Sequence, residues 1–332
     1  MFQEDEGIAA GENAVIQKPA PHLIPIIICA SISLFFMNTG FLSLFYLVPL
    51  GYAVMAYGSF WLTFFAAAAF NAVFRIVTRL ISGVGSGILW MEILYITVLF
   101  LGFIWIVGGA QMRAAYRFVL ASAAGSVVFL FYVNRPDSAF YAFLERMAAA
   151  VLFSEGDAVR ASVLQQMFTP EKLVELVKSV MFRGGALIST SFLFFINRQL
   201  SFSAVWIIKK QRKDKGLTAF FAPSYTIWVL SCSLAIVLLS TQLRLRAFEI
   251  IAWNVFAVCA IIFLAQGAGI LLCILSRRSG GFRFFASILI IIAIFSPVLN
   301  TVAIAGLLLL GIMENWLPFR APKEGQASTP GQ

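Results

Sequence analysis

Charge is scarce in this sequence. Only 12% of its 332 residues are Asp, Glu, Lys or Arg, whereas about 25% is usual for soluble proteins. Hydrophobic residues make up 61%, and the mean hydropathy is +0.92. A soluble fold of this size must cover its core with a polar shell, so the composition argues against a soluble enzyme, a disordered chain and a nucleic-acid-binding domain. It indicates a protein of the lipid bilayer.

Residues for metal, redox and nucleotide chemistry are also few. The single histidine, His22, excludes a histidine-based triad and a histidine-rich metal site. Four cysteines lie singly inside apolar runs, without zinc-ligand spacing, and no Walker A motif is present. We therefore expect no cofactor, no metal and no catalytic centre.

Long uncharged runs are what the sequence does have. Leu23 to Phe74 holds no charge at all, and a membrane-spanning helix needs about 20 residues, with about 17 as the lower limit. The run therefore holds two long spans or three short ones. Asn38–Gly40 offers one break, and Pro49, Gly51 and Gly58 offer others. We expect three spans, at 23–37, 41–57 and 59–79.

Further apolar segments follow along the chain. The run Phe284–Met313 would be about 45 Å long as one helix, which exceeds the hydrocarbon core of about 30 Å, so we expect a hairpin that breaks at Pro297–Asn300. The fold class is an all-α polytopic transmembrane bundle of eight to ten apolar segments. The remaining expected spans are 88–109, one that ends at Val133, 184–208 (interrupted at Asn197–Gln199), 222–241 and 248–276.

The segment 137–183 differs because charges are frequent in it. Thr169 is a suitable N-cap and Pro170 suits the first helical position. Apolar residues recur from Leu173 to Met181 on one helical face. We expect an amphipathic, extramembrane insertion that lies on the bilayer surface. The predicted divisions are a polar tail (1–22), a membrane bundle containing the insertion (23–210), C-terminal membrane helices (211–320) and a second polar tail (321–332).

The net charge of +9 comes from short cationic runs between apolar segments. Lys and Arg are favoured in cytoplasmic loops. With both termini in the cytoplasm, the dense cluster at 209–215 is cytoplasmic and the insertion is outside. This pattern indicates membrane orientation rather than a nucleic-acid partner.

Polar residues within apolar segments are the candidate ligand site. Ionisable groups are costly in the bilayer and have a partner or a task. Arg198, beside Asn197, either binds an anionic ligand, pairs with Glu92 or Glu249, or snorkels to an interface. Glu92 is either a ligand contact or an interfacial residue, and Gln266 either a ligand contact or a helix-packing residue.

The C-terminal third contains three motifs: Phe263–Gly267, Arg277–Arg278 and a closing motif with Gly311, Glu314, Trp316, Phe319 and Arg320. In these motifs the chain resembles the YybS-like family of bacterial multi-pass membrane proteins. The family usually has aspartate where Glu314 stands. Phe220–Pro223 is similar to the family's entry to a helix. Leu47–Leu50, followed by Gly58, is similar to the start of both this family and the S components of energy-coupling-factor transporters.

The resemblance implies a six-helix substrate-binding unit followed by extra helices in the bacterial inner membrane. It implies capture of a small molecule from outside, with energy from a separate coupling subunit and ATPase. The alternative is a non-catalytic envelope scaffold or assembly protein that binds other membrane proteins. An intramembrane enzyme would need an acid–base or metal cluster that the sequence does not offer.

Overall fold

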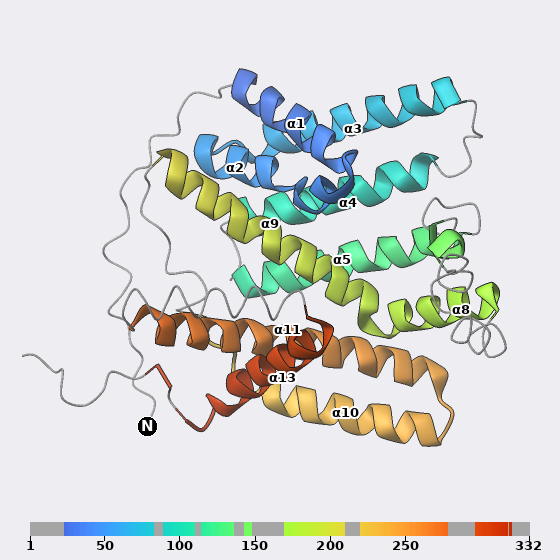
Figure 1. Ribbon diagram of the computed structural model, residues 1–332, viewed down its shortest axis with the longest axis vertical. Coiled ribbons are helices and arrows are strands. Elements are labelled where there is room, and N and C mark those ends of the chain that lie inside the picture. Colours follow the sequence, from blue (N-terminus) through green and yellow to red (C-terminus); the bar gives the residue numbers. More distant parts are fainter. Residues whose placement is uncertain are drawn as a thin grey trace, which may run out of the picture.

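Helices dominate the computed structural model, which describes residues 23–82, 89–109, 114–135, 143–147, 169–209, 220–277, 296–317 and 319–320. No strand occurs in those ranges, so the predicted all-α class is confirmed. Six of the helices are long and apolar enough to cross a membrane, and shorter apolar helices accompany them (Figure 1). The protein is a multi-pass membrane protein.

The first uncharged run forms three short segments, as predicted. They are α1 (Leu23–Met37), a 3₁₀ turn η1 (Gly40–Phe45) leading into α2 (Val48–Tyr57), and α3 (Phe60–Ser82). Gly58 ends α2 in a left-handed conformation, with φ of 65°, and its N–H bonds to the carbonyl of Val54. Glycine tolerates that conformation without strain, which allows α3 to start two residues later.

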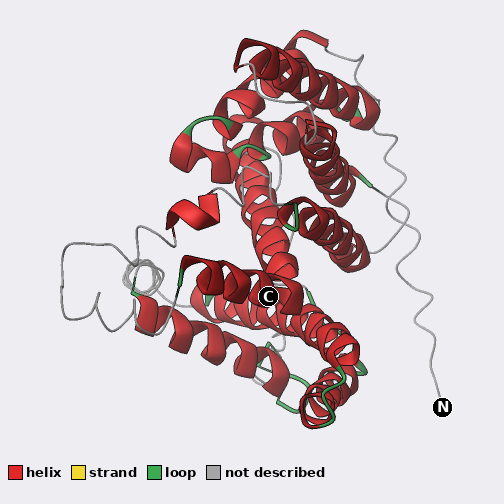
Figure 2. Ribbon diagram, turned by 90° about the vertical axis from the view of Figure 1, so that its right-hand side faces the viewer, coloured by secondary structure: helices red, strands yellow, loops and turns green. Residues whose placement is uncertain are grey.

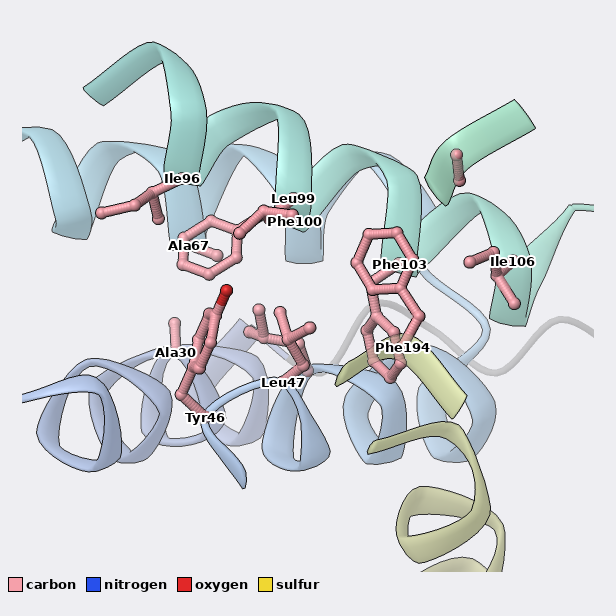
Figure 3. Packing of buried hydrophobic residues seen from close by; sticks show 12 residues of the cluster. Ala30, Tyr46, Leu47, Ala67, Ile96, Leu99, Phe100, Phe103, Ile106 and Phe194 are labelled. Atoms are coloured by element: carbon pink, nitrogen blue, oxygen red, sulfur yellow. The ribbon is translucent and has the colours of Figure 1, made fainter. Parts of the chain in front are cut away.

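These helices pack with α4 (Leu89–Gly108), α5 (Ala114–Val133) and α9 (Ala186–Lys209) into a body that we call the six-helix body (Figure 1). Aromatic side chains fill its centre. The rings of Phe103 and Phe194 lie 6.1 Å apart, and Tyr46 lies 6.0 Å from Phe100 (Figure 3). Burial of this cluster explains why α4 is apolar on several faces: it is enclosed by helices rather than by lipid alone.

The insertion ends in the predicted helix, α8 (Pro170–Val180), and the Thr169 side chain accepts a hydrogen bond from the Lys172 backbone N–H. The structure does not separate this helix from the next span. A π-helical turn, η3 (Met181–Gly185), joins α8 to α9 through a kink at Gly184, where φ is 106°. The predicted residues 137–142 and 148–168 of the insertion lie outside the described residues.

Three further helices follow: α10 (Thr226–Gln242), α11 (Arg246–Ser276) and α13 (Pro297–Met313) (Figures 1 and 2). Of these, α11 packs against α9 and its kink, and α10 and α13 pack against α11. The predicted break at Pro297–Asn300 is displaced, because these residues form the first turn of α13 and the helix begins after Ser296, whose side chain accepts from the Leu299 N–H. The other arm of the predicted hairpin, 284–295, lies outside the described residues.

Contacts between residues near the helix ends show which helix ends lie together at each end of the bundle. At one end, which we call the α8 end, Tyr132 near the close of α5 bonds to Glu92 at the start of α4, and Asn134 lines the same cleft as Arg246 and residues of α8. At the other, the Lys209 end, Lys209 Nζ bonds to the carbonyl of Ala56. Successive long helices therefore alternate in direction, as membrane spans must.

Candidate functional site

Two arginines share one buried glutamate at the α8 end of the six-helix body. Arg79 Nη2 lies 2.9 Å from Glu92 Oε1, and Arg75 Nη1 lies 3.5 Å from Glu92 Oε2. The Glu92 side chain is 5% exposed. Tyr132 also donates to Glu92, at 3.4 Å. Together with Asn71, these residues form what we call the arginine–glutamate cluster.

Helical spacing on α3 places the cluster. Ala67, Asn71, Arg75 and Arg79 recur every four residues, which brings them to one face of the helix. Ala67 and Asn71 are buried, and Ala67 packs in the aromatic core. The inner face of α3 thus changes from apolar to cationic as it approaches the α8 end.

Asn71 is the unusual member of this face. Its side chain is 0% exposed, yet neither its amide nitrogen nor its amide oxygen has a hydrogen-bond partner in the described structure. Arg75 Nε, one turn away, is likewise buried without a partner. Buried polar groups almost always form hydrogen bonds to protein, bound solvent or a ligand. The unpartnered atoms of Asn71 and Arg75 therefore mark a position where a ligand or solvent molecule can bind.

The cluster can hold an anionic group. Two guanidinium groups against one carboxylate leave a net positive charge. The ring of Tyr132, whose hydroxyl bonds to Glu92, stacks on the ring of Tyr95 at 5.9 Å. Among the described residues, no group of three His, Cys, Asp or Glu side chains could hold a metal ion. The side chains of the cluster offer charge and hydrogen bonds to a ligand.

Arg198 lies at the middle of α9, half-buried, with its guanidinium 4.6 Å from the centre of the Phe202 ring. Of the alternatives for Arg198, pairing with Glu92 or Glu249 does not occur: Glu92 pairs with Arg75 and Arg79, and Glu249 pairs with Arg183 at 3.1 Å. The expected interruption of this span is also wrong, because α9 runs through residues 197–199 without a break.

Asn197 braces the backbone rather than facing a cavity. Its Oδ1 accepts from the Leu47 N–H at 3.1 Å, and its Nδ2 donates to the carbonyls of Leu44 and Leu193. The Leu44 and Leu47 groups sit where η1 passes into α2, a junction whose backbone needs partners. The amide that we predicted as a ligand contact is thus already used by the fold.

Gln266 belongs to a second polar cluster, the C-terminal clasp, with Glu314, Arg320 and Ala222. Arg320 Nη2 lies 2.7 Å from Glu314 Oε2, and Gln266 Nε2 donates to the same oxygen at 3.0 Å. The Ala222 N–H donates to Gln266 Oε1, and the Arg320 guanidinium stacks over Phe221 at 4.4 Å. Three separate segments that carry the family resemblance therefore meet here.

The other motif residues have different surroundings. Gly311 is buried against the backbone of Phe263, Trp316 is 67% exposed, and Phe319 is partly buried. The four predicted ligand residues thus lie in three separate places. The sequence analysis did not single out Asn71, Arg75 or Arg79, although the four-residue spacing of the two arginines was an available signal.

Comparison with known proteins gives no relative: no protein-family model, no curated protein and no solved structure matches the chain.

Proposed function

We propose that the protein is a substrate-binding unit for membrane transport and that it takes a small anionic or zwitterionic solute at the arginine–glutamate cluster. The observation that carries this proposal is the Asn71 amide, which is fully buried and has no hydrogen-bond partner. Arg75 Nε, one helical turn away, also has no hydrogen-bond partner. Leaving a buried polar group unsatisfied costs about 1–3 kcal/mol. A solute that bonds to these groups recovers that cost.

The charges define the solute class. The Arg75 guanidinium offers donors to a carboxylate or a similar anion, and the Asn71 amide can both donate and accept. Glu92 adds a negative charge that matches an ammonium group on the same solute. A molecule with one anionic group and nearby polar groups fits this set better than an apolar one.

The position of the cluster supports capture from outside. The positive-inside pattern assigns the α8 end to the exterior, and the cluster lies in the body that the resemblance to S components would make the binding unit. On this proposal the protein works in a bacterial inner membrane, and a coupling subunit with its ATPase supplies the energy.

The test uses the full chain in lipid nanodiscs and identifies retained small molecules by native mass spectrometry. We expect a stoichiometric polar metabolite with the natural protein and none with Asn71→Leu. Leucine has a similar volume but no polar atoms, so it removes the orphan amide without opening a cavity, and the fold should keep or gain stability.

The matched control is Asn254→Leu. The Asn254 amide donates to the carbonyls of Phe182 and Ile250 in another part of the molecule. This variant should lose stability and keep the metabolite. Absence of any metabolite from the stable natural protein, with envelope proteins captured instead, would overturn the proposal and favour the scaffold.

A further inference from the structure

A second polar site lies outside the six-helix body, in a cleft of about 520 Å³ between α8 and the start of α11. Asn134, just after α5, closes one side. The cleft therefore lies where three helices end together, at the α8 end of the molecule. Its charged lining residues are Lys172, Glu175, Lys178, Arg183 and Arg246.

Cations dominate this lining. Arg183 is paired with Glu249 at 3.1 Å but remains 42% exposed. The lining has four cationic side chains, and the carboxylates of Glu175 and Glu249 balance two of them. The cleft therefore keeps a net positive charge. Lys172, Lys178 and Arg183 come from the continuous stretch of α8 and η3, and the fold adds Arg246 from the start of α11.

Apolar side chains complete the cleft. Leu176, Phe182 and Ile250 lie beside the cations, and Leu176 is 52% exposed. A free anion requires only the cations. A phospholipid requires both surfaces, since its phosphate needs positive charge and its glycerol and acyl groups need an apolar wall. An amphipathic helix with lysines next to exposed leucine is typical of the membrane boundary.

We infer that this cleft binds the phosphate group of an anionic phospholipid. Lys172 and Arg246, which approach from α8 and from α11, contact the phosphate, and Leu176 and Ile250 contact the apolar part. The bound lipid joins α8 to α11 at the membrane boundary. This site is separate from the arginine–glutamate cluster and does not depend on the function proposed for it.

The experiment measures lipid binding to the purified full chain by native mass spectrometry, with phosphatidylglycerol and phosphatidylcholine titrated separately. We expect phosphatidylglycerol to bind more tightly. In K172Q/R246Q its affinity should fall about 30-fold, because two cations near an anionic headgroup are removed. The control R135Q/R244Q removes the same charge from exposed positions at the same end but outside the lining, and should bind as the natural protein does.

A variant that gains affinity provides a test that misfolding cannot explain, because a misfolded protein would lose binding. Glu175→Gln removes the one carboxylate among the described lining residues and should tighten phosphatidylglycerol binding several-fold. Equal binding of the two lipids, an equal loss in R135Q/R244Q, or no gain in Glu175→Gln overturns the inference. Inorganic phosphate at millimolar concentration that displaces the lipid fully would identify a soluble phosphate ligand and would also overturn the assignment to lipid.

Discussion

Gln266 and Glu314 are 48 residues apart in the chain, yet Gln266 Nε2 donates a hydrogen bond to Glu314 Oε2 across 3.0 Å. The same oxygen accepts from Arg320, and both charged side chains are more than nine-tenths buried. Since Arg320 also donates to the carbonyls of Phe220 and Gln266, one guanidinium ties the C-terminal segment to α11 and to the entry of α10. The clasp thus fixes the last three described helices relative to one another.

The first prediction concerns the charge at the centre of the clasp. Arg320→Met would leave Glu314 as a buried carboxylate without its partner. We expect the free energy of unfolding to fall by about 3–5 kcal/mol, as for other broken buried pairs. The measurement is equilibrium unfolding in mixed detergent micelles, followed by circular dichroism.

Two further variants separate the ion pair from simple loss of packing. Trp316→Ala changes a neighbouring but 67% exposed residue and should alter the free energy by less than about 0.5 kcal/mol. The double variant E314L/R320M should be more stable than R320M alone, because the unpaired charge is gone. If E314L/R320M is less stable than R320M, the unpaired Glu314 charge is not what destabilises R320M, and the prediction is contradicted.

A second prediction concerns the crossing of α11 and α13. A Cβ at Gly267 would overlap the Leu307 carbonyl, and one at Gly311 would overlap the Phe263 carbonyl. Backbone cannot yield as a side chain can, so G267A and G311A should each lower the free energy of unfolding by about 1–3 kcal/mol. Small residues permit such close helix approach in membranes.

Gly306 provides the matched control on α13, since a Cβ added there would meet nothing within 4 Å. G306A should leave stability unchanged or raise it by about 0.5–1 kcal/mol, because alanine favours the helix. Thermal unfolding of the three variants in one detergent decides the matter. Equal Tm values for G306A and G267A would contradict the close crossing.

A third prediction tests the brace that Asn197 provides. Asn197→Leu removes the partners of the Leu47 N–H and of the Leu44 carbonyl, which are far from it in sequence. We expect faster amide hydrogen exchange in peptides covering residues 40–50 and a stability loss of about 2–4 kcal/mol. Ser203→Ala, which removes only a bond to Gln199 within the same helix, should leave that exchange unchanged.

Most of the helix plan followed from the sequence, because its causes are local. The uncharged runs indicate where the spans lie. Gly58 ends α2 before the turn to α3, and Thr169 with Pro170 begins α8. The interruption expected in α9 was wrong for a tertiary reason. Asn197 is polar, but its amide is buried against η1 and α2, so a residue that looks like a helix break serves as a helix contact.

The candidate site was harder to predict, because it depends on which helices become neighbours. Glu92 was a candidate, yet its partners Arg75 and Arg79 belong to the preceding helix, and the expected partner Arg198 lies elsewhere. Asn71 has no local signature at all. A neutral amide in an apolar helix becomes notable only when its surroundings show that neither of its polar atoms is bonded.

The last prediction tests the orientation on which capture from outside depends. Ser224, just before α10, and Gln242, the last residue of α10, are both exposed, and in the sequence Ser224 follows the cationic cluster 209–215 without an intervening apolar span. In a background with the natural cysteines replaced by alanine, Q242C should react with a membrane-impermeant maleimide in intact bacterial cells. S224C should react only after permeabilisation, because Lys- and Arg-rich loops stay in the cytoplasm. The reverse pattern would move the arginine–glutamate cluster to the cytoplasmic side, and uptake from outside would then be the wrong direction for this site.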